Sequence, residues 1–395
     1  MKRAKLLSML LAFCMLISLF AGCGNTTESA ENPATGIGES TETGISDSVN
    51  EGASDESAEE LPAYKIGIIS HTTSGGCWDR ILDAAEYLGD ALNCEIVTAV
   101  GSSADAILTE AENFIAAGVD GIITLNDGGV TSRLVDICED ANVYLVFSDC
   151  GYSSYLDDDY ADYASNPYFL GHVAHDEYAD AYACASDMIA NGVENFVIFG
   201  LPPGIASNFD QRAVGAIDAI NDAGLDAPVE ARSYTMAELA SNLMSQYPDT
   251  DAIFSFVTTS QYFNTLEMAE QYGGKIQVSA YMEGDVTEEF ESGFLTHVSV
   301  GSEARIELSF ALLYSALRGT RIENEDGTAP NILFPHLWIT SAEDFATFYS
   351  ATTGGNHAYS LDEVEQLIAA FNSDVSVSDY ETLAAEFSTT WLSTK

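Results

Sequence analysis

Two patterns of apolar residues alternate along the chain after about residue 63. Short runs rich in β-branched residues predict strands, and segments with apolar residues three or four positions apart predict amphipathic helices. The predicted strands are Lys65–Ile69, Glu95–Val100, Gly121–Leu125, Tyr144–Phe147, Asn195–Phe199, Ala252–Phe256 and Ile276–Tyr281. The predicted helices are Trp78–Leu92, Ala104–Ala117, Val130–Asp140, Tyr178–Asn191, Gln211–Ala223, Met236–Gln246 and Gln261–Tyr272. Regular alternation of strand and helix predicts an α/β fold with parallel sheets.

The folded part extends from about Ala63 to Lys395, which is longer than one ordinary hydrophobic core and predicts two lobes. Right-handed crossovers place the loops that follow the strands at one edge of each sheet. Because sheets of this kind bind ligands at that edge, we expect ligand-binding residues just after the predicted strands.

The first 22 residues have the anatomy of an export signal. Lys2 and Arg3 precede an apolar run from Leu6 to Phe20, which is shorter than the roughly 20 residues that span a bilayer. The next tetrapeptide, FAGC, resembles the bacterial lipobox, and this resemblance implies lipidation of Cys23. The alternative is an ordinary secretory signal with a chance cysteine. Lipidation would anchor the protein to the cell membrane, facing the extracellular or periplasmic side.

Residues 23–62 consist mainly of Ser, Thr, Gly, Glu and Asp, which predicts a disordered acidic linker behind the lipidated N-terminus. The whole chain has 13 Lys and Arg against 62 Asp and Glu, a formal net charge of -49. Nucleic acid is excluded as a partner, because phosphate binding requires clustered cations.

Cysteine and histidine spacing does not favour a disulfide framework or a metal site. Beyond the signal segment and Cys23 the chain has an odd number of cysteines without a CxxC pair: Cys77, Cys94, Cys138, Cys150 and Cys184. Most are predicted to be buried. His172 and His175 in HVAHDE are three residues apart, so on a strand they face opposite sides. No metal or other cofactor is expected.

Several longer motifs follow the order of a known family. KIGIISHTTSGGCWDRILDAAEYLG, AAGVDGIITLNDGG and VYLVFSDCG resemble the N-terminal lobe of type 1 periplasmic binding proteins, the ribose-binding-protein-like components of ABC transporters. VAHDEYADAYACASDMI, FGLPPGIASNFDQRAVGAIDAINDAG and VSAYMEGDVTEEFESGFLTHVSVGSEARIELSFALLYSALRG continue the likeness to about Arg321. The resemblance implies two doubly wound parallel-sheet lobes joined by a three-segment hinge, which close on a small molecule.

The resemblance also implies lobe boundaries. Residues 64–167 plus 301–321 would form the N-terminal lobe, and residues 168–300 plus 331–341 the C-terminal lobe. Residues 342–395 carry no motif of the family and are predicted to form a helical extension.

Two candidate ligand-binding residues fall in the first lobe. Trp78 follows the loop SGGC, where the family commonly offers an aromatic ring for stacking; the alternative is a buried core tryptophan. Asp149 ends VYLVFSD at the position of the family's ligand-binding carboxylate. A solvated turn or a helix cap is the alternative for Asp149.

Further candidates fall in the second lobe. Arg212 matches the arginine that opens the family's second-lobe helix and could pair with ligand hydroxyls or a carboxylate; the alternative is a helix-surface ion pair with Asp210 or another acid. Glu283 in YMEGD stands where the family usually has the aspartate of a GFDG-like turn. Asp176 would face the cleft or cap a helix.

The chain also departs from the family's pattern at several expected ligand contacts. Thr258 and Thr259 replace an Asn-Asp pair, with Thr258 still a candidate ligand contact. Val300 replaces a glutamine, and Cys150 replaces an arginine. These changes remove polar sugar clamps. An unmodified pentose or hexose is therefore less favoured than the fold alone suggests, and a less hydroxylated or ring-bearing ligand is favoured more.

No GxSxG elbow, HExxH helix or GxxxxGK[ST] loop occurs in the sequence, so we expect a binding protein rather than an enzyme. The leading hypothesis is a monomeric, membrane-anchored lipoprotein that delivers a sugar-like or other small polar ligand to an ABC permease. A sensory binding protein that reports to a membrane kinase or chemoreceptor is the second hypothesis. An extracellular hydrolase on the same fold is the third.

Overall fold

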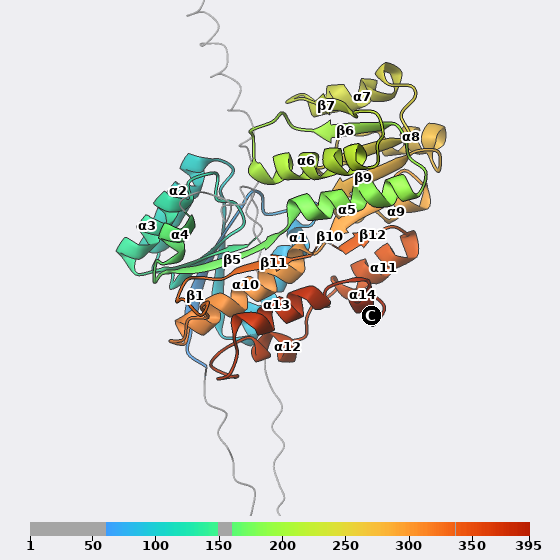
Figure 1. The fold of residues 1–395 in the computed structure, drawn as a ribbon. Helices are drawn as coiled ribbons and strands as arrows, with labels where there is room; N and C mark the ends of the chain where they lie inside the picture. The colour runs from blue at the N-terminus through green and yellow to red at the C-terminus, as the bar shows by residue number, and fades with distance from the viewer. Residues whose placement is uncertain (1–60, 149–159, 336) are drawn as a thin grey trace, which may run out of the picture. The chain divides into compact units, whose positions relative to one another are not determined.

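The computed structural model describes residues 61–148, 160–335 and 337–395, which belong to one compact unit. These residues form two six-stranded sheets with helices packed against them (Figure 1). The predictions made for the signal segment, Cys23, nearly all of the acidic linker, and Asp149 lie outside the described residues.

The first sheet has the strand order β11-β5-β4-β3-β1-β2, and its neighbouring strands are parallel. Its strands are β1 (Tyr64–Ser70), β2 (Cys94–Val100), β3 (Gly121–Thr124), β4 (Tyr144–Ser148), β5 (Phe169–His175) and β11 (Asn331–Phe334). Its helices are α1 (Trp78–Ala91), α2 (Ala104–Ala116), α3 (Thr131–Ala141), α4 (Tyr160–Ala164) and α10 (Ser302–Leu317).

Two apolar clusters occupy the two faces of this sheet. Ile68 packs in one cluster with Leu88 of α1, and the next residue, Ile69, packs in the other with Ile107 of α2. Successive side chains of a strand point to opposite faces, so the continuous apolar run of β1 serves both clusters. Helices therefore cover the sheet on both sides.

The second sheet has the order β12-β10-β9-β8-β6-β7, in which only the pair β10 and β12 is antiparallel among the described pairs. Its strands are β6 (Phe196–Gly200), β7 (Val229–Arg232), β8 (Ala252–Ser255), β9 (Gln277–Tyr281), β10 (His297–Val300) and β12 (Leu337–Ile339). Its helices are α5 (Glu177–Ala190), α6 (Ser207–Asp222), α7 (Met236–Gln246), α8 (Thr265–Tyr272) and α9 (Thr287–Glu291). Helices α5 and α6 lie side by side (Figure 1).

The predicted α/β fold with parallel sheets is confirmed, and every predicted strand and helix overlaps an observed one. The largest boundary differences are four residues, at α6, which begins at Ser207 instead of Gln211, and at α8, which begins at Thr265 instead of Gln261. Asn264 is its N-cap and accepts a hydrogen bond from the backbone of Glu267, which fixes the start of the helix. The strands β5, β7 and β10 were not among the predicted strands.

Three chain segments cross between the sheets. They connect β5 to α5 at residues 175–177, β10 to α10 at residues 300–302, and β11 to β12 at residues 334–337. In each of the first two crossings a single residue, Asp176 or Gly301, separates the strand from the helix that follows. These crossings form the three-segment hinge that the resemblance implied.

The lobe boundaries expected from the sequence require correction. Residues 169–175 had been assigned to the second lobe, but they form β5, which pairs in parallel with β4 of the first sheet. Residues 331–334 had also been assigned to the second lobe, but they form β11, which pairs with β5. The physical reason is that the chain crosses to the second lobe only after β5, whose buried side chains pack within the first sheet. After β11, only residues 337–339 join the second sheet.

The last part of the chain, residues 342–395, contains α11 (Ala342–Ala351), α12 (Leu361–Gln366), α13 (Val377–Glu386) and α14 (Thr389–Leu392). We call these residues the C-terminal extension. In Figure 1 they run from the second sheet, beside α9, to α10 and β11 of the first sheet. Their apolar side chains join the same core cluster as both lobes, among them Phe345, Phe348, Tyr359, Phe387 and Trp391.

One buried carboxylate attaches the C-terminal extension to α10. Glu307 is fully buried and accepts hydrogen bonds from the backbone N–H groups of Ala358 (3.1 Å) and Tyr359 (3.0 Å). Burial raises the pKa of Glu307 well above its usual value, the two backbone hydrogen bonds oppose the shift, and the charges of Glu303 and Glu363 add to it. The folded state therefore holds a proton that the unfolded state releases at lower pH.

This shift predicts how Glu307 affects stability across the pH range. Between the usual glutamate pKa, about 4.3, and the raised pKa in the fold, the folded state binds more protons, so its stability falls as the pH rises. Glu307→Gln removes this titration. We expect the melting temperature of Glu307→Gln, relative to the parent, to increase steadily from pH 4 to pH 8 in differential scanning calorimetry. A difference that stays constant over this range would contradict the prediction.

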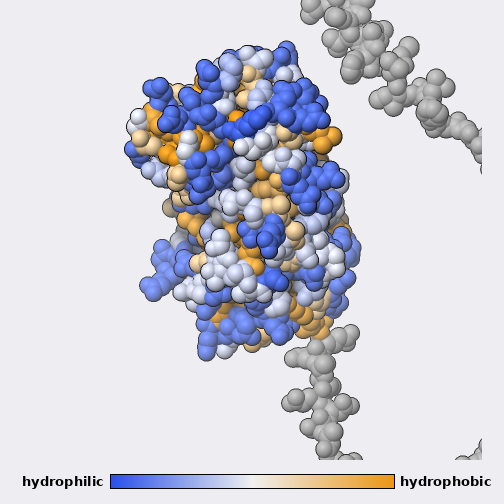
Figure 2. All heavy atoms as spheres, turned by 90° about the vertical axis from the view of Figure 1, so that its right-hand side faces the viewer, coloured by the Kyte–Doolittle hydropathy of each residue, from blue (hydrophilic) through white to orange (hydrophobic). Residues whose placement is uncertain are grey.

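In the view of Figure 2, hydrophilic residues cover most of the face, and apolar residues reach the surface in smaller areas between them.

The four described cysteines, Cys77, Cys94, Cys138 and Cys184, are all buried, as predicted. Burial raises the pKa of both Cys94 and Cys138 to about 12, so neither thiol is ionised near neutral pH. No helix in the described residues has the length and apolar character needed to cross a membrane.

Candidate ligand-binding site

The carboxyl ends of the parallel strands lead into the segments that contain the predicted site residues. In the first lobe β1 is followed by the loop before α1, and in the second lobe β8 and β9 are followed by the loops at Thr258 and Glu283. In parallel sheets these ends meet at one edge. The candidate site is therefore built from the ends of both sheets and the crossing into α5.

Trp78 is the first residue of α1, and its side chain is half-buried against the core. The glycine two residues before it touches the second lobe: Gly76 has a φ of +57°, and an added Cβ would lie 2.9 Å from the carbonyl oxygen of Met282. Gly284 approaches the same backbone. Only glycine permits this conformation together with this close approach. The structure thus places Trp78 beside a contact between the two lobes.

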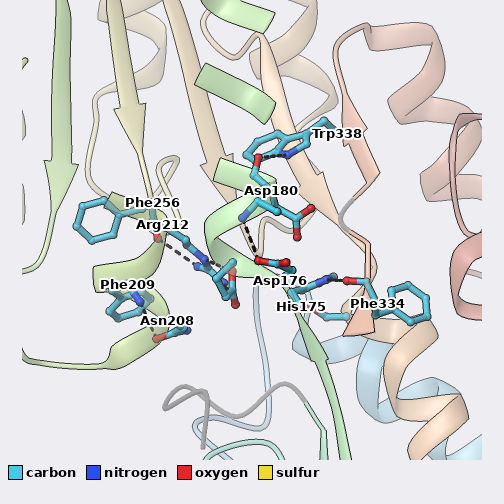
Figure 3. Close-up of polar contacts among 12 residues, drawn as sticks. His175, Asp176, Asp180, Asn208, Phe209, Arg212, Phe256, Phe334 and Trp338 are labelled. Carbon is cyan, nitrogen blue, oxygen red and sulfur yellow. Dashed lines mark hydrogen bonds and ion pairs between the residues drawn. The ribbon is translucent and has the colours of Figure 1, made fainter. Parts of the chain in front are cut away.

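Arg212 lies on the first turns of α6, and it is buried with 1% of its surface exposed. Its Nε donates to one carboxylate oxygen of Glu177 (2.6 Å) and its Nη2 to the other (2.8 Å). Its Nη1 donates to the backbone carbonyl of Phe256 (3.2 Å), as Figure 3 shows. The guanidinium also lies over the ring of Tyr281, 4.0 Å from its centroid. Such planar, bidentate and stacked contacts are those that favour arginine over lysine.

This geometry corrects the alternative that the sequence left open for Arg212. The ion pair with another acid exists, and that acid is Glu177 of α5, but the pair is buried instead of lying on a helix surface. Asp210 pairs with Arg232 at 2.8 Å. A buried carboxylate therefore balances the charge of Arg212 within the protein.

Glu283 is buried, and its carboxylate holds the loop that follows β8. One carboxylate oxygen accepts from the backbone N–H groups of Thr259 and Ser260 (3.0 Å for Ser260), and the other accepts from the Ser260 hydroxyl (2.6 Å). Burial raises the pKa of Glu283, and these hydrogen bonds oppose the rise. Thr258, half-buried, is the residue before this held segment. The observed contacts of Glu283 position the Thr258 loop.

Asp176 lies in the first crossing between the lobes. It is the N-cap of α5, and its carboxylate accepts a hydrogen bond from the backbone N–H of Ala179 (3.0 Å). The capping role considered for Asp176 is confirmed. The neighbouring His175 is within 2.6 Å of the backbone carbonyl of Phe334, which lies in the third crossing (Figure 3). In the described residues no group of three or more His, Cys, Asp or Glu side chains is placed to hold a metal ion.

The predicted residues are partly brought together. The loop before Trp78 touches the backbone at Met282 and Gly284, next to Glu283. Arg212 is connected through the Phe256 carbonyl to the segment that leads to Thr258. Asp149 and Cys150 lie outside the described residues.

Sequence reasoning missed two residues of this region. Glu177 supplies the partner of Arg212, and Arg80 of α1 donates to the backbone carbonyl of Glu283 (3.1 Å). The chain has 13 Lys and Arg, so few cations are available to balance its acids. Arg80, in the first turn of the helix that follows the first predicted strand, could have been singled out on that ground. Glu177 follows Asp176 directly in HDEY, but nothing in its sequence context distinguishes it from the many other acidic residues.

A cavity of about 400 Å³ lies where the lobes and the C-terminal extension meet. Gly76 and Arg80 line it from the first lobe, Gly284 and Asp285 from the second, and Tyr349 from the C-terminal extension. A larger, open hollow of about 810 Å³ lies between α1 and the C-terminal extension. Neither cavity is lined by Trp78, Arg212 or Thr258, but the smaller one adjoins the candidate site at Gly76, Arg80 and Gly284.

Comparisons with known proteins give likeness of structure without likeness of sequence. No protein-family model matches this chain, and no curated protein matches it in sequence. Solved structures do resemble it. An ABC transporter periplasmic solute-binding protein of Actinobacillus succinogenes 130z with bound D-allose has a TM-score of 0.59 and 18% identity, and the match covers 72% of this chain and 99% of that one.

Two further solved structures show how widely the fold occurs. A carbohydrate transporter of Acidothermus cellulolyticus 11B in complex with myo-inositol has a TM-score of 0.59 and 14% identity, with 75% of this chain and 100% of that chain covered. A protein of Bacteroides fragilis described as a LacI transcriptional regulator has a TM-score of 0.57 and 12% identity, with 72% and 99% covered. The matches cover nearly all of these proteins but only 72–75% of this chain, so this chain has segments that they lack. The chain has the fold of type 1 periplasmic binding proteins.

Proposed function

We propose that the protein is an extracytoplasmic substrate-binding lipoprotein of an ABC importer. It captures a small polar ligand, a sugar or a sugar-like molecule, by closing its two lobes, and it performs no catalysis. The observation that carries this proposal is the pair of parallel sheets joined by three crossings, a fold shared with solute-binding proteins solved with D-allose and myo-inositol.

The charge arrangement supports an uncharged ligand. Arg212 is the cation that the resemblance assigns to the ligand, and the carboxylate of Glu177 balances its charge through two hydrogen bonds. The carboxylate of Glu283 is likewise engaged by the Thr259 and Ser260 segment. Such a site recognises hydroxyl groups and an apolar ring face better than it recognises an anion.

The same fold occurs in a protein described as a transcriptional regulator, but DNA binding does not suit this chain. A formal net charge of -49 would repel the phosphate backbone, since DNA binding depends on clustered cations.

We assign the lipid anchor to Cys23 and the membrane partner to an ABC permease. A Cys23→Ser variant should then leave the membrane fraction of the producing cells and appear in the soluble exported fraction. Retention in the membrane fraction would contradict lipid anchoring at this residue.

Ligand binding is tested by thermal shift with the Cys23→Ser protein. Neutral pentoses, hexoses and polyols, including D-allose and myo-inositol, are compared with sugar acids such as gluconate and glucuronate. A ligand at 100 times its Kd stabilises the native state by about 2.7 kcal/mol, which raises the melting temperature measurably. We expect at least one neutral compound to produce the shift and the sugar acids to produce none.

Variants connect the shift to the candidate site. Trp78→Ala should reduce or abolish the shift, because the ligand would lose its stacking surface. Tyr234→Ala is the matched control: Tyr234 is an aromatic residue with 73% of its surface exposed, and it lies in the segment between β7 and α7. An equal shift in parent and Trp78→Ala would remove Trp78 from the site. Shifts produced only by the sugar acids would overturn the uncharged ligand.

A further inference from the structure

The C-terminal extension contacts the second lobe through α11. This helix follows β12 of the second sheet, and the ring of Phe345 packs 5.4 Å from that of Phe290 in α9. Phe345 is fully buried. The start of the C-terminal extension is thus part of the second lobe's apolar core.

The C-terminal extension then returns to the first lobe. His357 stacks on Tyr87 of α1, with 3.9 Å between ring centroids and 14° between planes. Glu307 of α10 accepts from the next two backbone N–H groups, and the backbone N–H of Ala369 donates to the hydroxyl of Ser315 in α10 (3.0 Å). One continuous segment therefore binds α9 on one side of the hinge and α1 and α10 on the other.

Arg80 lies where these three parts meet. Its guanidinium lies over the ring of Phe348 in α11, 5.4 Å from the centroid, and its Nη2 donates to the backbone carbonyl of Glu283 in the second lobe. It also pairs with Glu303 at the start of α10, at 3.5 Å. A side chain of the first lobe is thereby fixed to both the second lobe and the C-terminal extension.

Phe387 packs directly on the hinge crossings. Gly301, the residue of the second crossing, has a φ of +130°, and an added Cβ would lie 3.1 Å from the ring of Phe387. The same point lies 3.5 Å from the ring of Phe334, in the third crossing, and 3.6 Å from that of His175, in the first. Phe387 itself is fully buried. Phe387 thus lies against the second crossing at Gly301 and, 5.2 Å from the ring of Phe334, against the third, beside the point where the first crossing also approaches Gly301.

We propose that the C-terminal extension is a brace across the hinge that limits how far the two lobes open. Hinge opening changes the backbone angles of the crossing residues. Close packing around Gly301 and Phe334 opposes such changes, because a packed core switches between discrete arrangements and does not deform continuously. The inference rests on the proposed function, in which the lobes close on a ligand, and it adds the element that sets the open limit.

The test measures the distance between the lobes in the full chain without any ligand. Nitroxide-bearing non-canonical residues are introduced at Ser132 of α3 and Ala237 of α7, which are both exposed, so the native cysteines stay unchanged. Double electron–electron resonance then gives the distance distribution for the parent and for Phe387→Ala. The matched control is Phe371→Ala, because Phe371 belongs to the C-terminal extension but is 40% exposed and stacks on Tyr314, away from the crossings.

We expect Phe387→Ala to lengthen the mean distance by about 2 Å or more and to broaden the distribution, as hinge rearrangements do. Phe371→Ala should match the parent. A folded Phe387→Ala protein with the parent distribution would overturn the brace. If circular dichroism shows that Phe387→Ala does not fold, Phe387→Leu is judged by the same criterion. Because no ligand is used, a widened distribution supports the brace even where the thermal-shift screen fails, and the two proposals fail separately.

Discussion

Replacing Glu177 with alanine is expected to lower the free energy of unfolding by about 3–5 kcal/mol, because the buried guanidinium of Arg212 would lose the bidentate carboxylate of Glu177. Arg212 would keep its hydrogen bond to the Phe256 carbonyl and its contact with the Tyr281 ring, but neither of these is charged near neutral pH. Urea denaturation followed by circular dichroism, extrapolated to zero denaturant, measures the change.

The matched control is Glu95→Ala. Glu95 pairs with Lys65 at 3.0 Å, but its side chain is 64% exposed, so its loss should change the free energy of unfolding by about 1 kcal/mol or less. The double variant Glu177→Leu with Arg212→Met should be far more stable than Glu177→Ala, because it removes both charges of the pair together. Equal small effects for Glu177→Ala and Glu95→Ala would show that the Arg212 pair is hydrated in solution.

Trp391→Ala is expected to have an effect of similar size, about 3–5 kcal/mol, for an apolar reason. The indole of Trp391 packs 4.6 Å from the ring of Phe387 and 6.5 Å from that of Phe348, and its Nε1 donates to the backbone carbonyl of Ala358 (3.1 Å). Alanine would leave a cavity and an unsatisfied carbonyl. The same urea denaturation gives the loss.

Phe371→Ala provides the comparison for this variant as well, since the partly exposed ring of Phe371 leaves a smaller cavity. We expect Phe371→Ala to be clearly less destabilising than Trp391→Ala. Indistinguishable values, both under about 1 kcal/mol, would mean that the C-terminal extension is attached only loosely and contributes little to the core.

The fold was predictable to the extent that its signals are local. Apolar runs such as Gly121–Thr124 and amphipathic segments such as Trp78–Ala91 carry their own periodicity, and their alternation determines a parallel sheet. The lobe to which β5 belongs was not predictable, because β5 reaches a crossing and its assignment depends on pairing with β4 and β11. A strand contains no local signal for the partner beside which it will lie.

In the candidate site, too, single residues were predictable from the sequence, whereas their long-range partners were not. The sequence indicated Arg212 and Glu283 as residues with special roles, and both are buried polar groups with several partners. Their partners lie 35 and 24 positions away in the chain, so the pairing of Arg212 with Glu177 and of Glu283 with Thr259 comes from the fold. In a chain with 62 Asp and Glu, no pattern distinguishes the one carboxylate that a buried arginine selects.

The first sheet cannot be completed while the ribosome is still making the second lobe. β11, which forms one edge of the first sheet, and α10, which packs on its β3, β4 and β5, both come after β10 in the chain. β12, at the edge of the second sheet, comes later still, at Leu337–Ile339. Each nascent lobe therefore exposes apolar surface until nearly all of the described residues have been synthesised. Such late, long-range pairing makes folding slow. For the exported lipoprotein proposed above, slow folding would favour the unfolded state that passage through an export channel requires.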